Sequence, residues 1–157
     1  MTRRLIVLRH AKADALVGGA DHARVLTPEG RDQARAVGAR LAAAGLRPDH
    51  VLCSTARRTR QTLELALAAF ESPPPVEYED ALYSADVPAV LDLVSRTDPA
   101  VHTLLVVGHN PTMAQLAGAF MADEPLTGFP PAATAVVDLE VEWLYAAPGT
   151  GTARLLA

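Results

Sequence analysis

The sequence is poor in cysteine, in excess basic charge and in long apolar runs. Its one cysteine, Cys53, excludes an internal disulfide and a cysteine-rich metal site. The formal net charge of -4 argues against a general nucleic-acid or membrane-surface binder, because such proteins present a basic face. No basic segment is followed by a long apolar stretch, so we expect neither a signal peptide nor a membrane span. A cytoplasmic location is the default expectation.

The chain also lacks internal repeats and low-complexity tracts, apart from the three prolines at 73–75. What it has is a globular composition, with 50% apolar and 20% charged residues. Its 157 residues suffice for an ordinary hydrophobic core, and no linker rich in proline, glycine or serine divides them. We therefore expect a single domain over residues 1–157.

Short apolar runs alternate with helical patterns along the chain, which is typical of an α/β fold. The run at 5–8 is apolar throughout, as expected of a parallel strand that is buried on both faces. The polar stretch from 11 to 26 is long for a loop in a compact domain, and such loops are often functional. The predicted strands lie at 5–8, 51–53, 76–78, 103–107 and 134–141, with an antiparallel edge strand at 153–156.

Helix starts are marked by residues that cap free backbone N–H groups. Thr27 is followed by Pro28 at the first helical position, and Gly45 is placed to end that helix. A buried inner face at Ala56, Thr59, Leu63, Ala66 and Phe70 defines the next helix. The other predicted N-caps are Ser54 or Thr55, Asp86, and Asn110 with Pro111 at the first helical position.

Three of the predicted strands are followed directly by polar or charged residues. Arg9-His10 follows the first strand, Ser54 to Arg58 follows the second, and Gly108-His109-Asn110 follows the strand at 103–107. In open α/β sheets the ligand cleft lies beyond the carboxyl ends of the strands, so these side chains should meet at one rim. Two imidazoles surrounded by positively charged arginine side chains are suited to the transfer of a phosphoryl group.

Phosphoryl transfer assigns a role to each of these groups. Neutral His10 is expected to attack phosphorus through a ring nitrogen, giving a phosphohistidine intermediate that water then opens. Arg9 and Arg58 are expected to hold the equatorial oxygens, because guanidinium forks match phosphate geometry, and His109 to donate a further hydrogen bond. No metal or other cofactor is expected, since no HExxH motif, Cys/His cluster or carboxylate-rich magnesium set is evident.

Each of these residues also has an ordinary structural interpretation. A histidine at a strand end is more often hydrogen-bonded or on the surface than catalytic, and arginines at 57, 58 and 60 also suit the solvated face of a helix. The appearance of His10 and His109 after two separate buried strands favours catalysis. We interpret His22, His50 and His102 as surface or structural residues, Cys53 as a buried, inert thiol, and Trp143 and Tyr145 as packing residues.

Four segments together resemble the histidine phosphatase superfamily, also called the phosphoglycerate mutase-like family. Arg9-His10-Ala11 resembles its Arg-His-Gly motif, with alanine in place of glycine as in the SixA-type branch. The segment 26–34 resembles its Leu-Thr-x-x-Gly-x-x-Gln-Ala pattern, and 107–111 resembles its second histidine motif. The segment 54–62 resembles Ser-x-x-x-Arg-Ala-x-Gln-Thr, which places the second phosphate arginine at Arg58, with Gln61-Thr62 as the anchor.

The resemblance implies a three-layer α/β/α sandwich with a mostly parallel central sheet, compact and without the cap insertions of mutases and phytases. It implies that His10 is the phosphorylated nucleophile. It also offers Arg24 as a loop arginine that folds over the phosphate, with a solvated loop arginine as the equal alternative. The Leu-x-Glu of many members, whose glutamate protonates the leaving oxygen, is absent. Glu79, Asp80 and Asp86 are possible acids, although none stands at the matching place.

The missing acid bears on the substrate. An alkoxide needs a strong proton donor to leave, since an alcohol's pKa is about 16, whereas imidazolium has a pKa of about 6.5. The sequence therefore predicts a phosphatase that removes phosphate from phosphohistidine on a partner protein. Two alternatives stay open: a broad-specificity phosphomonoesterase acting on small phosphorylated metabolites, and a non-catalytic phosphohistidine-binding module. The oligomeric state is open as well.

Overall fold

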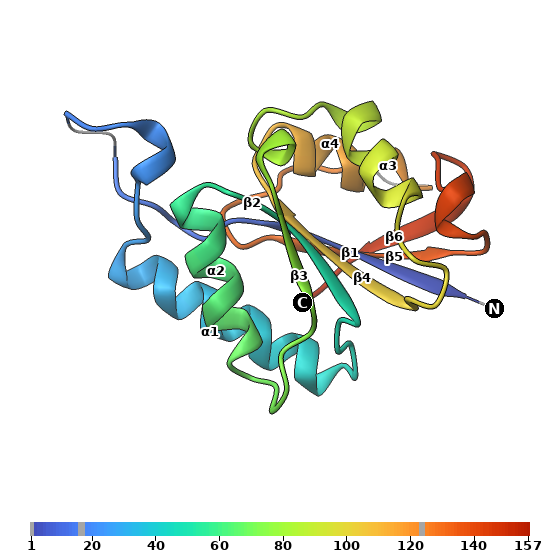
Figure 1. Ribbon diagram of the computed structural model, residues 1–157, viewed down its shortest axis with the longest axis horizontal. Helices are drawn as coiled ribbons and strands as arrows, with labels where there is room; N and C mark the ends of the chain where they lie inside the picture. The colour runs from blue at the N-terminus through green and yellow to red at the C-terminus, as the bar shows by residue number, and fades with distance from the viewer. Residues whose placement is uncertain (1, 16–17, 123–124) are drawn as a thin grey trace.

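The computed structural model describes residues 2–15, 18–122 and 125–157 (Figure 1). Within these residues a six-stranded sheet has the strand order β3-β2-β4-β1-β5-β6. β1 to β4 pair in parallel, whereas β5 runs antiparallel to β1 and to β6, so the predicted mostly parallel sheet is confirmed. The strands are β1 (Arg3–Arg9), β2 (His50–Ser54), β3 (Val76–Glu79), β4 (Thr103–Gly108), β5 (Thr134–Leu139) and β6 (Gly151–Leu155).

Helices cover both faces of this sheet, which confirms the predicted three layers (Figure 1). On one face lie α1 (Pro28–Ala43) and α2 (Arg57–Leu67), and on the other lie α3 (Val87–Ser95) and α4 (Thr112–Ala119). Short 3-10 turns occur at η1 (Asp21–Ala23), η2 (Asp80–Tyr83) and η3 (Trp143–Tyr145). Among the described residues, no helix is long and apolar enough to cross a membrane.

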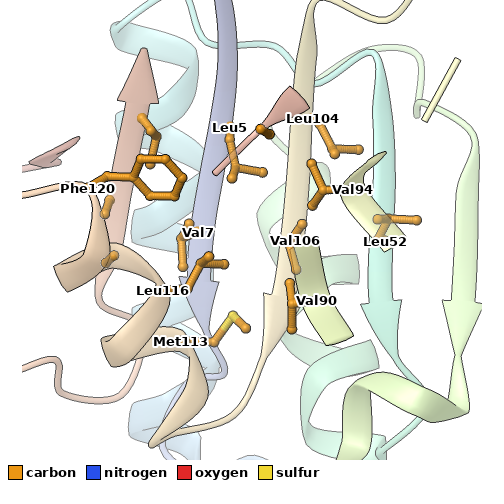
Figure 2. Packing of buried hydrophobic residues seen from close by; sticks show 14 of the residues in the cluster. Leu5, Val7, Leu52, Val90, Val94, Leu104, Val106, Met113, Leu116 and Phe120 are labelled. Atoms are coloured by element: carbon orange, nitrogen blue, oxygen red, sulfur yellow. The ribbon is translucent and has the colours of Figure 1, made fainter. Parts of the chain in front are cut away.

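The alternation of side chains along β1 builds a core on each face of the sheet. Leu5 and Val7 belong to the core beneath α3 and α4, whereas Ile6 and Leu8 belong to the core beneath α1 and α2. Figure 2 shows the first of these cores, where Met113 of α4 points toward Val7 and Val106. Burial on both faces explains why the run at 5–8 is apolar without interruption.

The start of α1 is packed tightly against the chain that leaves β1. Thr27 caps the helix as predicted, with its Oγ accepting from the Gly30 N–H at 2.9 Å, and Gly45 follows the helix at a φ of 70°. A Cβ at Gly30 would lie 2.0 Å from the carbonyl oxygen of Lys12. Glycine is therefore required here by close approach of two backbone segments.

Two predicted N-caps need correction. Neither Ser54 nor Thr55 caps α2, which begins at Arg57 after Ala56 and has no side-chain cap, because the Ser54 hydroxyl bonds to His109 instead. α4 begins at Thr112, one residue later than predicted. The Asn110 Oδ1 still accepts from the Ala114 N–H at 3.2 Å. Asp86 caps α3 as predicted.

Two predicted packing positions also need correction. Phe70 lies beyond the end of α2 and is half-buried, although it still packs against the core beneath α1 and α2. Trp143 is buried as expected, and its Nε1–H donates to the Val101 carbonyl oxygen at 2.8 Å. The 3-10 turn that starts at Trp143 leaves Tyr145 on the outside, where it is 62% exposed.

Candidate active site

The two histidines are brought together by the pairing of their strands. β1 and β4 are parallel neighbours in which Arg9 lies opposite Gly108, and each strand is followed at once by a histidine. The backbone N–H of His10 donates to the Gly108 carbonyl oxygen at 3.1 Å. The ring centroids of His10 and His109 are 5.4 Å apart, so both imidazoles lie at the carboxyl-end rim of the sheet.

His10 is buried and held in one tautomer by the backbone. Its Nδ1 lies 2.7 Å from the Ala11 carbonyl oxygen, which can only accept, so the neutral ring carries its hydrogen on Nδ1. Burial lowers the pKa of His10 to about 4, with smaller contributions from the charges of Arg58 and Arg9. The ring is therefore neutral near pH 7 and keeps its lone pair on Nε2.

Arg58 is the arginine of α2 that faces this lone pair. It is buried in the first turn of α2, and its Nε–H donates to His10 Nε2 at 3.4 Å. Arg57 and Arg60 are exposed, and the Arg60 guanidinium carbon lies over the Tyr78 ring, 4.6 Å from its centroid. The structure thus separates Arg58 from the other two, as the resemblance implied.

Arg9 closes the strand side of the site. It is half-buried, and its Nη1–H donates to the Phe129 carbonyl oxygen at 3.0 Å. Its buried Nε finds no hydrogen-bond partner in the described part of the chain. Its positive charge is one of those that lower the pKa of His10. Arg9 therefore supplies positive charge beside the His10 ring.

His109 is oriented by Ser54 at the end of β2. The Ser54 Oγ accepts from the Ala56 N–H at 3.3 Å and lies 2.7 Å from His109 Nε2. The hydroxyl hydrogen is then free to bond to Nε2, which leaves the hydrogen of the neutral ring on Nδ1. That Nδ1 is buried and unpaired within the described residues, and burial lowers the pKa of His109 to about 3. A neutral ring with an unused N–H suits an anionic oxygen.

The loop after β1 is pinned by side chains from the two helices below it. The Thr62 Oγ1 accepts from the Ala11 N–H at 3.0 Å, and the Gln61 Oε1 accepts from the Leu26 N–H at 2.8 Å. The Gln33 Oε1 accepts from the Lys12 N–H at 3.0 Å. Gln61-Thr62 thus serves as the expected anchor, and the backbone next to His10 is fixed from α1 and α2.

Farther along this loop, at the rim of the site, Asp21 accepts several hydrogen bonds. Its carboxylate accepts from Arg24 Nη1 at 3.0 Å, from Arg58 Nη2 at 3.2 Å and from the Tyr83 hydroxyl. Its backbone oxygen accepts from Arg58 Nη1 at 2.9 Å. Arg24 reaches the cluster through Asp21, and its charge is among those that lower the pKa of His10. Sequence reasoning missed Asp21, for which the length of the loop was the one signal.

Tyr83 and His22 complete the rim and were also missed. The Tyr83 ring meets the His109 ring edge-on at 5.4 Å and the His22 ring at 5.0 Å, measured between centroids. His22 is exposed, as predicted, but its Nε2 lies 2.9 Å from the Thr55 Oγ1, so it belongs to the rim. Ser54 was wrongly predicted as a helix cap, although its place at a strand end could have marked it.

None of the three candidate acids bonds to His10 or His109 in the part of the chain that the structure describes. Glu79 ends β3, and the Asp80 Oδ1 accepts from the Thr55 hydroxyl at 2.8 Å. Asp86 accepts from the Ala89 N–H at 3.0 Å and lines a cleft of about 320 Å³ with His109 and Tyr83. No group of three or more His, Cys, Asp or Glu among the described residues is placed to hold a metal ion.

A second cleft opens beside the rim. It has a volume of about 480 Å³ and is lined by His22, Thr55, Arg57 and Arg60, with Glu64 as its acidic member. His22 and Thr55 connect it to the Asp21 and Tyr83 side of the site. Neither His10 nor His109 lines this second cleft, which therefore adds open surface beside the pair of histidines.

Comparison with known proteins gives one consistent result. The family model of the histidine phosphatase superfamily (branch 1) matches residues 5–90. An uncharacterised protein of Mycobacterium tuberculosis is 38% identical over 151 residues, which cover 90% of this chain and 93% of that protein. A structure from Nakamurella multipartita, provisionally assigned as phosphohistidine phosphatase SixA, has 33% sequence identity and a TM-score of 0.87. It covers 100% of this chain and 96% of its own.

A further solved structure, the protein histidine phosphatase SixA complexed with tungstate, is 27% identical with a TM-score of 0.78. That alignment covers 97% of this chain and 93% of the other. The chain therefore belongs to the histidine phosphatase superfamily. Within the superfamily it is of the SixA type, and it is a phosphatase with a histidine nucleophile.

Proposed function

We propose that this protein is a metal-independent phosphohistidine phosphatase in which His10 is the nucleophile. The observation that carries the proposal is the state of His10. It is buried and neutral, with Nδ1 committed to the Ala11 carbonyl and Nε2 facing Arg58. In the first step, a bond forms between His10 Nε2 and phosphorus while the bond from phosphorus to the leaving nitrogen breaks. The other ring nitrogen of the substrate phosphohistidine carries a proton, so the imidazole leaves as a neutral molecule and needs no proton from the enzyme.

The second step returns the enzyme to its starting state. Water attacks the phosphoryl group on His10, inorganic phosphate departs, and the electron pair of the broken bond returns to Nε2. In both steps Arg9 and Arg58 offset charge on the phosphoryl oxygens, and the free Nδ1–H of His109 donates to one of them. These donors are in place before substrate arrives, so little reorganisation is needed during the reaction.

The proposed substrate is a phosphohistidine on a partner protein. The absence of a carboxyl group bonded to either histidine, among the described residues, favours a leaving group that needs little protonation. The open clefts on the rim offer room for a protein surface. The likeness to SixA structures supports the same substrate class, one of them holding tungstate, a tetrahedral oxyanion. One catalytic domain over residues 1–157 and a cytoplasmic location stay predictions.

One observation favours the second candidate, a broad-specificity phosphomonoesterase. Asp86 lines the same cleft as His109, so its carboxyl group is the acid best placed to approach a leaving oxygen. Its role as N-cap of α3 opposes this, because its carboxylate already accepts a hydrogen bond from the Ala89 N–H and is held at the start of the helix. Asp86→Ala separates the two candidates: a large loss on alkyl phosphates, together with retained cleavage of aryl phosphates, supports the phosphomonoesterase.

The decisive experiment compares kcat/KM on three substrates with EDTA present throughout. We expect a phosphohistidine-bearing phosphotransfer protein to react fastest, p-nitrophenyl phosphate more slowly and glycerol phosphate slowest. Rapid quenching should trap an acid-labile, base-stable phosphoenzyme in the native protein, and His10→Asn should abolish both the label and turnover. Equal rates on all three substrates would overturn the substrate assignment. A requirement for added Mg²⁺ or Zn²⁺ would overturn the metal-independent mechanism.

A further inference from the structure

The Asp21 carboxylate ties three distant parts of the chain together. Arg24 lies in the same loop, Arg58 lies in α2, and Tyr83 lies in η2, yet all three side chains donate to Asp21. These donors, Tyr83 first and Arg24 next, hold the pKa of Asp21 well below its usual range. The carboxyl group is therefore ionised at neutral pH and does not act as the missing proton donor.

The contacts of Asp21 leave a specific part of Arg58 free. A guanidinium has five N–H donors in a planar fork. Asp21 takes one from Nη1 and one from Nη2, through its backbone oxygen and its Oδ2. The Nε–H points at His10 Nε2, and one N–H on each Nη has no partner among the residues that the structure describes. A phosphoryl group on His10 thus meets the Nε edge of Arg58 while Asp21 still holds the terminal edge.

We propose that Asp21 is a positioning residue that fixes the Arg58 guanidinium with its Nε edge toward the phosphoryl group on His10. This inference rests on the proposed function of His10 and Arg58. Without the Asp21 carboxylate, the Arg58 side chain is less restrained and populates more rotamers. Binding the phosphoryl group then costs more conformational entropy. Asp21 therefore acts through Arg58 and touches neither the substrate nor the reacting nitrogen.

The opposite interpretation gives the opposite sign. If the Asp21 carboxylate instead occupied the place of the phosphate, substrate would have to displace it before binding. Removing the carboxylate would then strengthen anion binding. Positioning predicts that Asp21→Ala and Asp21→Asn weaken inhibition by inorganic phosphate and by tungstate, and lower kcat/KM by about 10- to 100-fold. Tighter inhibition by either anion in these variants would overturn the proposal.

A double-mutant cycle tests whether Asp21 works through Arg58. Asp21→Ala is made in the native protein and in Arg58→Ala, and p-nitrophenyl phosphate hydrolysis is measured in all four proteins. If Asp21 acts only by holding Arg58, its removal costs about 10- to 100-fold in the native protein and less than about twofold in Arg58→Ala. Equal losses in both backgrounds would overturn the proposal.

Two controls keep the result interpretable. Asp14→Ala removes an exposed carboxylate from the same loop and is expected to change neither kcat/KM nor anion inhibition, since only the backbone oxygen of Asp14 contacts Arg24. Asp21→Asn keeps the shape of the side chain and guards against misfolding of the alanine variant, with Tm measured for both. Because the assay uses any phosphate ester that the enzyme cleaves, a failed phosphohistidine preference leaves this test intact.

Discussion

The site consists of two groups of residues that are held in different ways. The strand-end group, His10, Ser54 and His109, follows buried strands and is fixed by the sheet and by backbone contacts. The loop group, Asp21, His22 and Arg24, is partly exposed and is fixed by hydrogen bonds of side chains to other side chains and to backbone oxygens. The comparison indicates that the sheet fixes the two histidines, whereas the loop arranges the charges around them. Changes in the first group should act on kcat, and changes in the loop on binding.

The largest effect is expected at Arg58, which belongs to α2 and joins the two groups. Arg58→Ala removes a buried charged donor beside His10 Nε2, so kcat/KM should fall by about 10²–10³-fold. Arg57→Ala and Arg60→Ala are matched controls on exposed positions of the same helix, with expected losses of less than about threefold. Steady-state kinetics on p-nitrophenyl phosphate measures all three. Comparable losses at Arg57 or Arg60 would remove the distinction between buried and exposed arginines.

The pH dependence tests the strand-end group. Protonation of His10 removes the lone pair on Nε2, and burial lowers the pKa of His10 from 6.5 to about 4. The free enzyme should thus keep its kcat/KM as the pH falls from 7 to about 5, and lose about tenfold per unit below pH 4. A pH profile on a substrate that does not itself titrate in this range measures the limb. An acid limb centred near an ordinary histidine pKa would show that His10 is not protected.

A smaller effect is expected from the support of His109. Ser54→Ala removes the hydroxyl that bonds to His109 Nε2 and sets its tautomer, so kcat should fall by about tenfold with little change in KM. Thr55→Ala is the matched control, because Thr55 bonds to rim residues and not to His109. Since Ser54 is fully buried, Tm is measured beside kcat. An unchanged kcat in Ser54→Ala would show that the sheet alone orients His109.

The smallest effect is expected in the loop. Arg24→Ala should raise KM by about two- to fivefold and leave kcat nearly unchanged, since Arg24 is partly exposed and its hydrogen bond within the site is to Asp21. Arg35→Ala, which removes a surface ion pair with Asp32 on α1, serves as the control. If Arg24→Ala lowers kcat as strongly as Ser54→Ala does, the loop takes part in fixing the reacting atoms.

The same division explains how much could be predicted from the sequence. The strands and the histidines at their ends were predictable, because burial on both faces of β1 and β4 leaves an uninterrupted apolar run before each histidine. Arg58 was predictable from the motif at 54–62. The start of α2 was misplaced, because the Ser54 hydroxyl bonds to His109 and α2 has no side-chain cap. The start of α4 was one residue early, because Pro111 precedes the helix, which begins at Thr112.

The loop contacts could not be predicted in the same way. Asp21 and Tyr83 are 62 positions apart in the chain and meet only because η1 and η2 lie at the same rim. No local periodicity or capping rule links residues at such a separation. The length of the loop at 11–26 marked the region as functional, but its partners depend on the tertiary structure.

The close approach at Gly30 fixes the position of the backbone that follows β1 relative to helix α1. A Cβ at position 30 would lie 2.0 Å from the Lys12 carbonyl oxygen, and the preceding peptide carries the Ala11 oxygen that bonds to the His10 ring. Any side chain at position 30 would have to push this backbone aside and tilt the acceptor that fixes the tautomer. A substitution at position 30 that adds no charge would thus shift the His10 ring by displacing the backbone alone. Position 30 therefore influences the orientation of the His10 ring through the backbone, although it lies outside the site.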